Sequence, residues 1–542
     1  MSSSSAPLEG QTGLSILPVE LLHSIWSFLS NNDIKSLRLT CKLLAELASL
    51  RLSRVFLSPN PLNIQVFQAV ADHPTFREKI TEIIWDDACL IEEPTLDDVY
   101  PDELREDNYI DSDEECPIWF VDCCEENLDE LTRRKGWDVD RPDHIARAKQ
   151  VAAQPPLKVC WQYYHNLLQQ QADVLASEND VDAFIYGLKQ FPALQRVTIT
   201  PAAHGRLHAP LYRTPMIRAF PYGFNYPIPR GWPTSTDLDM PPYASQWTNL
   251  SEKGRNKWRG FRVVTRVLAQ HKHNVQEFVI DDHQLPTGLN CTIFNEPCEE
   301  YTNFAALLTT PGFSRLDLAL IVGGQQKMDW SSVRNGRLRR SLASAKDLRH
   351  FTFRSTVLSI RSSDANLPGR DGSHTHFIPL QTIFPVDHWS SLTHFGLSRF
   401  LVVQSDVISL LSAMPNTIRS IELSFLGFLD DSGTWRDLLI DMRNTLHWHD
   451  REVGSRPRVT IGVDMATPRA GFGIWIEDEV CDFLYGGGPN PFSEKFPNDI
   501  LLSVGIERDT FELEHERPYA AVDVLAQAGF IDKHLVEHYL NA

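Results

Sequence analysis

The clearest pattern of apolar and polar positions lies between residues 17 and 44, where it predicts helices. Pro18 suits the first position of a helix, where a missing N–H costs nothing, and Glu20 complements the positive end of the helix dipole. The apolar positions that follow form a band too wide for one shallow contact: Leu21, Leu22, Ile25, Trp26, Phe28 and Leu29. We therefore expect this helix to be covered on more than one side.

A polar break separates this helix from a second one. Residues 30–33, Ser-Asn-Asn-Asp, can end the first helix and cap the next. Apolar residues then recur at i, i+3, i+7 and i+10, which is helical spacing. They are Ile34, Leu37, Cys41 and Leu44. Together the two segments predict a compact helical hairpin.

These residues resemble the F-box family, whose pattern runs Leu-Pro, then a Glu and an aliphatic residue, then Ile, Leu, Asp-aliphatic, Leu-Arg and Cys-Lys. The matching positions are Leu17, Pro18, Glu20, Leu21, Ile25, Leu29, Asp33, Ile34, Leu37, Arg38, Cys41 and Lys42. The chain departs from the pattern at its end, where Leu43 and Leu44 stand in place of a Trp that many members carry. The resemblance implies docking on the Skp adaptor of a cullin-RING ubiquitin ligase.

The resemblance and the apolar spacing together indicate the adaptor-binding residues, which are Leu17, Pro18, Leu21, Ile25, Leu29 and Leu37. The alternative is a helical hairpin that only caps the domain behind it. Size argues against this alternative, because a unit of about 40 residues is near the limit for a self-sufficient core. We expect its excess apolar surface to be covered by a neighbour or a partner.

Downstream, one arrangement recurs: a helical stretch, a short turn, and an apolar residue with apolar partners at +3 and +5. The triplets are Ile80/Ile83/Trp85, Leu194/Val197/Ile199, Val275/Phe278/Ile280, Phe313/Leu316/Leu318, Leu348/Phe351/Phe353, Leu392/Phe395/Leu397 and Ile418/Ile421/Leu423. Chance alone gives on the order of 40 such triplets in this chain, so the context carries the weight. Pro192 and Pro311 stand two residues before a triplet and Pro415 stands three residues before one, each after helical material. The pattern predicts a repeated helix–turn–strand unit.

The +3, +5 spacing is that of the leucine-rich repeat, in which each strand lines the inner wall of a curved solenoid. The later intervals between triplets are 38, 35, 44 and 26 residues, mostly longer than is usual for that repeat. We therefore expect an α/β fold in which the helical hairpin precedes an irregular leucine-rich-repeat-like solenoid with long loop insertions. Such an array shares one elongated core and presents a broad concave face that suits protein binding.

An ordinary α/β domain with a parallel sheet is the alternative, since it uses the same alternation of helix and strand. The lack of a Gly-rich nucleotide loop argues against it. Residues 69–77, 83–86 and 410–415 add a looser resemblance to the body of fungal F-box proteins with degenerate repeats.

These patterns divide the chain into four parts. We predict a disordered N-terminus at 1–13, an F-box at 14–58, the irregular solenoid at 59–458 and a C-terminal capping region at 459–542. Within the capping region, the predicted strands are 459–463 and 471–476, and the predicted helices are 520–528 and 533–540. The capping region would cover the open end of the solenoid.

Two insertions interrupt the predicted solenoid. Residues 201–247 are rich in Pro, Gly and aromatic side chains, and we expect them to pack over the solenoid rather than to form a sticky surface. Residues 86–130 hold 19 Asp and Glu against Arg105 alone, and so carry −18 of the net charge of −20. We interpret this acidic insertion as a mobile solvated loop; an electrostatic lure for a basic partner is the alternative. Trp119 and Phe120 would dock on that partner or on the domain itself.

Composition excludes several classes of protein. Nucleic-acid binding is disfavoured, because phosphate binding needs a basic stripe. No segment approaches the roughly 18 apolar residues of a membrane span, and the first residues lack a signal-peptide pattern. Nine scattered cysteines with no C-x-x-C suit a reducing compartment. We expect a protein of the cytoplasm, the nucleus or both, not a secreted one.

The chain carries no convincing catalytic or metal-binding motif. No G-x-S-x-G or H-E-x-x-H occurs, and the His-x-His pairs at 271/273, 374/376 and 447/449 lack a third ligand at a telling spacing. We therefore expect no enzyme activity, no cofactor and no metal. The sequence favours a substrate receptor of a Skp-cullin-F-box ligase, with a non-ligase F-box scaffold as the alternative.

Overall fold

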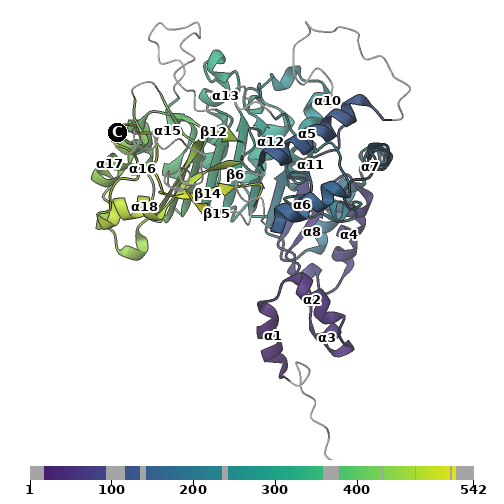
Figure 1. The fold of residues 1–542 in the computed structure, drawn as a ribbon. Helices are drawn as coiled ribbons and strands as arrows, with labels where there is room; N and C mark the ends of the chain where they lie inside the picture. The colour runs from purple at the N-terminus through teal and green to yellow at the C-terminus, as the bar shows by residue number, and fades with distance from the viewer. Residues whose placement is uncertain are drawn as a thin grey trace, which may run out of the picture.

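The computed structural model describes residues 17–92, 116–134, 142–234, 242–357, 378–429, 432–469, 471–512 and 516–519. They form a mixed α/β protein built on a mostly parallel 13-stranded sheet. A small group of N-terminal helices projects from the body that holds the sheet (Figure 1). The α/β class expected from the sequence is confirmed.

Neighbouring strands of the sheet are also neighbours in the chain. The order β1-β2-β3-β4-β6-β7-β8-β10-β12 is parallel throughout, and β13, β14 and β15 then add antiparallel strands. The parallel strands are β1 (Arg54–Leu57), β2 (Glu82–Asp86), β3 (Arg196–Thr200), β4 (Glu277–Ile280), β6 (Arg315–Ile321), β7 (His350–Ser355), β8 (His394–Ser398), β10 (Ser420–Ser424) and β12 (Arg458–Arg469). The antiparallel strands are β13 (Phe472–Ile476), β14 (Ile506–Asp509) and β15 (Glu516–Pro518). The short β5 (Leu289–Asn290) pairs with the end of β6, and β9 (Leu401–Val402) pairs with β11 (Gly427–Phe428).

The predicted strand units are confirmed. In every triplet the second and third residues occupy the second and fourth positions of a strand, and all three residues are buried. The reason is the period of two along a strand, which sends these side chains to one face while the first, third and fifth positions face the other way. The strand order has no reversal from β1 to β12, whereas a doubly wound sheet reverses its order.

Helices that follow successive strands pack on one another and on the buried side of the sheet. Contacts link α11 to α12, α12 to α14, α14 to α15, α15 to α16 and α16 to α17, and their apolar side chains share one core with the strands. The helices of the body are α4 (Pro61–Asp72), α5 (Ile118–Arg134), α6 (Pro142–Ala152), α7 (Leu157–Ser177), α8 (Asn179–Gln190), α9 (Pro215–Arg218), α10 (Glu252–Arg255), α11 (Arg259–Gln270), α12 (Glu299–Leu308), α13 (Ser331–Arg334), α14 (Arg337–Ser344), α15 (Leu380–Ile383), α16 (Gln404–Ser412), α17 (Trp435–Thr445) and α18 (Asp478–Cys481).

The N-terminal helices are α1 (Val19–Ser27), α2 (Asn31–Arg38) and α3 (Lys42–Leu47), and they have an apolar core separate from that of the sheet. The predicted second helix is wrong in one respect, because the chain leaves the helix after Arg38 and starts α3 at Lys42. Residues 54–57, within the predicted F-box span, form β1 and belong to the sheet. The predicted disordered segment 1–13 lies outside the described residues.

The interpretation of the acidic segment as one mobile loop is wrong at both ends. Asp86 is the last residue of β2 and is buried, and the segment 118–134 forms α5. Phe120 of α5 is buried in a second apolar core, and Trp119 packs against it, so these aromatic side chains dock on the protein itself. They stabilise a helix whose acidic residues face outward. Residues 93–115 lie outside the described part of the chain.

The aromatic insertion packs over the body, as expected. Phe224 and Tyr226 are buried in the second core together with Phe120, and Trp232 and Trp247 are buried in the main core. Tyr222 of the same segment is exposed.

The predicted strands at 459–463 and 471–476 are confirmed as parts of β12 and β13. Because β12 pairs with β10, the boundary drawn at 458/459 falls inside a strand of the sheet. The residues that end and follow β14 contact the loops that follow β3 and β4. There Thr510 Oγ1 donates to the His283 carbonyl (2.8 Å), and Phe511 packs with Ala202 and Leu285.

Residues 459–512 therefore extend the sheet and reach back across it, rather than only covering one end. The predicted helices at 520–528 and 533–540 lie outside the described residues. Among the residues that the structure describes, none of the helices combines the length and the apolar character needed to cross a membrane.

Candidate protein-interaction surfaces

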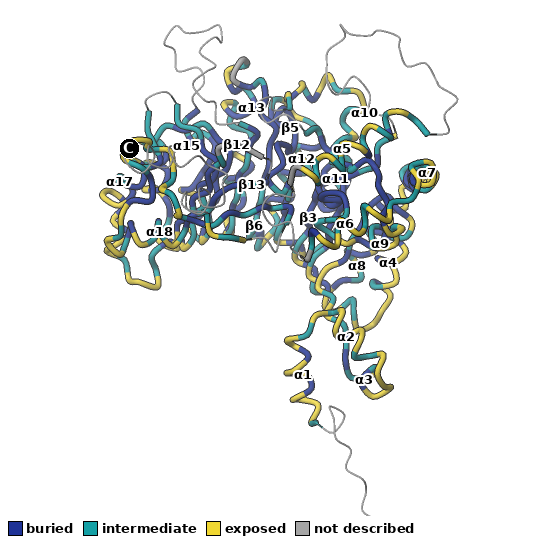
Figure 2. The backbone as a smooth tube through the Cα atoms, viewed as in Figure 1, coloured by how far each residue is buried: buried dark blue, intermediate teal, exposed yellow. Residues whose placement is uncertain are grey.

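Helix α1 has two apolar stripes that are offset by one residue. Leu22 and Trp26 point into the core of the N-terminal unit, where Leu29 packs against them. Leu21, Ile25 and Phe28 form the other stripe at i, i+4 and i+7, and their exposed fractions are 52%, 38% and 86%. Figure 2 shows these helices as largely exposed. The wide apolar band of the sequence is thus half covered by the unit itself and half open to solvent.

Polar contacts hold the stripes of the N-terminal unit in place. Ser30 caps α2 by accepting from Asp33 N (3.2 Å), and the Asp33 carboxylate accepts from Ser30 N (3.0 Å). The hydrogen bonds from the hydroxyl and the backbone of Ser30 lower the pKa of Asp33. Arg51 donates to the Ser27 carbonyl (2.6 Å), and Arg38 donates to the Ala48 carbonyl (2.5 Å). These bonds tie the end of α1 to the segment that leads into the sheet.

The predicted adaptor-binding residues separate into two groups. Pro18, Leu21 and Ile25 are exposed and available to a partner. Leu17, Leu29 and Leu37 are half-buried and pack against the unit's own core. Leu17, Leu29 and Leu37 therefore support the exposed surface from the core of the unit and offer little area to a partner.

Sequence reasoning missed the most exposed apolar side chains of this unit. Phe28 and Leu39 have exposed fractions of 86% and 88%, and Val19 and Leu43 are also exposed. A helical wheel carries a signal for Phe28, because it continues the i, i+4, i+7 stripe of Leu21 and Ile25. Leu39 carries no such signal, since it lies in the break between α2 and α3.

A second candidate surface is the face of the sheet that points away from the helices. Arg196 of β3 pairs with Glu277 of β4 (2.6 Å), and Arg315 of β6 pairs with Asp317 of the same strand (2.6 Å). Asp317 also contacts His350 of β7 (3.1 Å). Burial would raise the pKa of Asp317, but hydrogen bonds from His350 and Arg315 outweigh burial and lower it. The face is thus a row of mutually paired charges rather than a patch of one sign.

The row continues across β8 and β10. The rings of His350 and His394 stack at 4.1 Å with an angle of 9° between their planes, and His394 Nδ1 lies 3.0 Å from Ser420 Oγ. Burial, reinforced by the neighbouring His350, lowers the pKa of His394 to about 4. His394 is therefore neutral at physiological pH and can accept or donate one hydrogen bond.

A buried polar cluster fastens the aromatic insertion to the end of β2. The Asp87 carboxylate accepts from Trp232 Nε1 (2.7 Å) and from Gly260 N (2.8 Å), and burial raises its pKa to about 6 despite these bonds. Burial also raises the pKa of Asp86 to about 8 and lowers that of His204 to about 3. His204 Nδ1 meets the Tyr226 hydroxyl at 2.8 Å. No cavity of useful size reaches these groups in the described residues around them, so we assign them a structural role.

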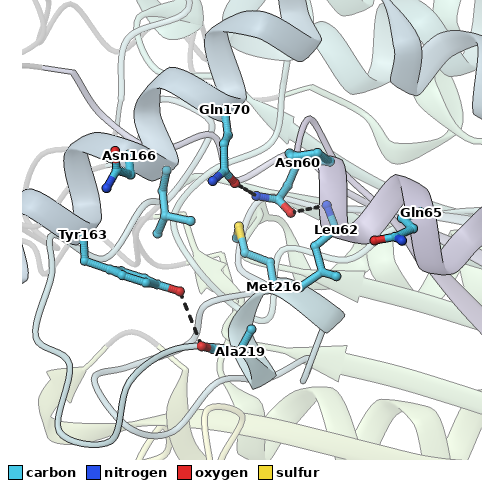
Figure 3. Close-up of a pocket in the computed structure, with 10 residues that line it drawn as sticks. Asn60, Leu62, Gln65, Tyr163, Asn166, Gln170, Met216 and Ala219 are labelled. Atoms are coloured by element: carbon cyan, nitrogen blue, oxygen red, sulfur yellow. Dashed lines mark hydrogen bonds between the residues drawn. The ribbon is translucent and has the colours of Figure 1, made fainter.

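A cleft of about 560 Å³ lies between α4, α7 and α9 (Figure 3). Gln170 and Asn60 face one another across it, and the Tyr163 hydroxyl points at the Ala219 carbonyl. Its lining residues are Asn60, Pro61, Leu62, Gln65, Tyr163, Asn166, Leu167, Gln170, Met216 and Ala219. Burial raises the pKa of Tyr163, which is the only ionisable side chain in that lining. The cleft suits a neutral polar group, and Tyr163 is the one candidate acid or base among its lining residues.

One group of side chains has the spacing of metal ligands: Asp143, His144 and Glu512. Arginines already neutralise its carboxylates, because Arg147 lies 3.0 Å from Asp143 and 2.9 Å from Glu512. Arg206 lies 3.5 Å from Glu512 as well. A cation would have to compete with two guanidinium groups, so the site does not suit a metal.

The His-x-His pairs gather no third ligand among the described residues. His447 and His449 are exposed at the end of α17, where Asp450 is their only close carboxylate, at 3.7 and 3.0 Å. The pair 374/376 lies outside the described part of the chain.

No family model matches this chain, and no curated protein matches its sequence. Function must therefore be inferred from the chain's own residues and their arrangement. What the described surfaces offer is binding: an exposed apolar stripe on a projecting helical unit, and a polar sheet face on the body.

Proposed function

We propose that the chain is a substrate receptor of a Skp-cullin-F-box ubiquitin ligase. In this proposal the N-terminal unit, residues 17–50, is an F-box that docks on the Skp adaptor. The observation that carries the proposal is the exposed stripe of Leu21, Ile25 and Phe28 on a unit that stands apart from the body. Apolar side chains exposed side by side on a small unit are typical of an interface.

The body would be a degenerate leucine-rich-repeat-like solenoid. The unreversed order of parallel strands and the one continuous core of strands and helices support this assignment. The face of the sheet opposite the helices would hold a target protein, and the adaptor would bring the ligase to it. The receptor would then act by raising the effective concentration of target lysines near the ubiquitin-charged enzyme.

A non-ligase scaffold is the second candidate. It would use the same docking stripe but would not bring cullin to a target. The order of the strands and the exposure of α1 fit this candidate equally well, so cullin recruitment must separate the two.

The test is adaptor binding by the purified chain, measured by isothermal titration with recombinant Skp adaptor. We expect wild type to bind and Leu21→Asp/Ile25→Asp to bind at least about 10-fold more weakly, because two charges would be buried in an apolar contact. Val453→Asp is the matched control, since Val453 is an exposed aliphatic side chain far from α1 in the sequence. Retained binding by the double variant would contradict the proposal.

Cullin recruitment is read from a pull-down that uses wild type and a Leu17→Ala/Pro18→Ala variant. Adaptor and cullin with wild type, both lost with the variant, would support the receptor. Adaptor without cullin would favour the scaffold. Absence of both partners from the wild-type sample, with the chain verified as folded, would overturn the F-box assignment.

A further inference from the structure

Two arginines lie near the C-terminal ends of β7 and β8. Arg354 is the fifth residue of β7, and its register partner on β8 is Ser398. Arg399 follows Ser398 directly and leaves the strand with a φ of 52°.

Arg399 is buried without a hydrogen-bonding partner. Its exposed fraction is 3%, and within the described part of the chain its buried Nε has no hydrogen-bond partner. Its close contact is the ring of Phe425, 4.7 Å from the guanidinium carbon. A buried guanidinium that lacks an acceptor is strongly disfavoured unless something else supplies one.

The backbone holds Arg399 in this place. Arg399 N donates to the Ser424 carbonyl (3.0 Å), and Phe425 N donates to the Gly462 carbonyl (2.8 Å). Gly473 makes room for the ring on which Arg399 stacks, because a Cβ there would lie 2.8 Å from Phe425. The position of the guanidinium is therefore built into the sheet.

Arg354 adds a further unsatisfied donor, and its charge interacts with that of Arg399. Arg354 lies opposite Ala319 of the neighbouring strand β6. The Arg354 side chain extends over Ala319, and its Nη1 donates a hydrogen bond to the buried carboxylate of Asp282. Its Nε has no acceptor, and neither has the hydroxyl of Ser398. The unpaired donors in this part of the sheet are thus Arg354 Nε, Ser398 Oγ and Arg399 Nε.

Among the described residues, no carboxylate forms a hydrogen bond with the side chain of Arg399. Asp282 pairs with Arg354, and burial raises the pKa of Glu422, which the charge of Arg354 partly opposes. Burial lowers the pKa of Arg399, and the charge of Asp464 opposes this effect. An anion that accepts from both arginines would satisfy the donors and balance the charge together.

We propose that Arg354, Ser398 and Arg399 form a binding site for an oxyanion, a carboxylate or phosphate group. The site deepens the proposed function, since in a substrate receptor the oxyanion would belong to an acidic or phosphorylated residue of the target. Binding of a small oxyanion by the purified chain does not require the adaptor. Failure of this site and failure of the adaptor-binding proposal are therefore distinguishable.

The test uses the full chain and inorganic phosphate as the probe, with sodium chloride at matched ionic strength as the reference. We expect 50 mM phosphate to raise the melting temperature of wild type by about 2 °C more than chloride does. Arg399→Met keeps the length and the apolar stem of the side chain but removes the charge, and we expect it to lose this difference. By titration, its affinity for phosphate should fall about 10-fold or more.

Arg349→Met is the matched control, because Arg349 precedes the other end of β7 and is exposed. It should respond to phosphate as wild type does. Ser398→Ala keeps both charges and removes one donor, so it tests the site even if Arg399→Met does not fold. No phosphate effect beyond chloride, or an equal effect in wild type, Arg399→Met and Ser398→Ala, would overturn the proposal.

Binding of three probes at equal concentration shows which kind of molecule carries the oxyanion. These are inorganic phosphate, N-acetyl-phosphoserine amide and N-acetyl-glutamate amide. Preference for the phosphoserine probe would support a phosphorylated target, and preference for the glutamate probe an acidic one. A response to inorganic phosphate alone would support a site for the free ion.

Discussion

Burial sets the protonation of single side chains at the end of β2, and Asp86 has the clearest consequence for stability. Its pKa is about 8 in the folded chain against 3.8 ordinarily, so between these values the folded state retains a proton that the unfolded state releases. Stability must therefore fall as the pH rises through this range. His204 has the opposite effect: its lowered pKa makes stability fall as the pH drops below 6.5.

Asp86→Asn should remove the alkaline part of this dependence. Between pH 6 and 8, wild type should lose about 2 kcal/mol more unfolding free energy than the variant does, because only wild type has the Asp86 carboxyl group to ionise, whereas both proteins have Asp87. Asn can still accept the hydrogen bond that Ala88 N donates to Asp86 (3.1 Å). Urea unfolding at both pH values measures the difference, and equal losses in the two proteins would contradict the assignment of the shift to Asp86.

At this scale the sequence could predict little of the polar structure. Arg354 and Asp282 are 72 residues apart, and neither stands in a motif. Their contact depends on the small side chain of Ala319 between them, which only the strand register reveals. The exposed Phe28, in contrast, could be foreseen from helical spacing alone.

At the scale of elements, local spacing predicted what local contacts determine. The triplet pattern predicted the strands correctly because its three residues are close in the sequence and are buried in the same core, two of them inside the strand and one just before it. The break between α2 and α3 was missed, because Cys41 and Leu44 continue the helical period across it. Helix α5 was missed because acidic residues dominate its composition, whereas its fold depends on Phe120 meeting Tyr164 and Trp161 from a distant segment.

Leu21 and Leu22 are neighbours in α1 but belong to different stripes, so we expect their substitutions to change stability by different amounts. Leu22→Ala should destabilise the N-terminal unit by about 2–5 kcal/mol, since Leu22 is buried in a small core. Leu21→Ala should change stability by less than about 0.5 kcal/mol, because its side chain is exposed. Hydrogen exchange in residues 17–50 measures both changes. Because this core is separate from that of the sheet, protection in β6 and β7 should not change, and similar losses in the two variants would contradict the assignment of the stripes.

At the scale of the whole molecule, the segment after β14 connects parts of the chain that are far apart. Arg206 donates to Asp509 (2.9 Å) across 303 residues, and Arg147 donates to Glu512 (2.9 Å) across 365. No pattern in the sequence points to these pairs, because the two partners of each pair lie more than 300 residues apart. They hold the returning segment against the sheet.

Arg206→Ala should release this segment locally. The carboxylate of Asp509, exposed to only a small degree, would lose its bonds to Arg206, at a cost of about 3–5 kcal/mol. We expect faster hydrogen exchange in residues 505–512 and little change in β2. Unchanged exchange at 505–512 would mean that the apolar contacts of Phe511 suffice to hold the segment.

The unreversed order of strands also fixes a distance. In the sheet, β7 is five strands away from β1, and β8 is six strands away. Because neighbouring strands lie about 4.8 Å apart, Arg354 and Arg399 lie roughly 25–30 Å along the sheet from β1, the strand that follows the N-terminal helices. Each step also turns the sheet by about 20–25°. Deletion of one helix–strand unit between β2 and β7 would therefore shorten the reach from those helices to the arginines by one step and rotate their direction, and it would also remove the charges that the deleted strand contributes to the sheet face.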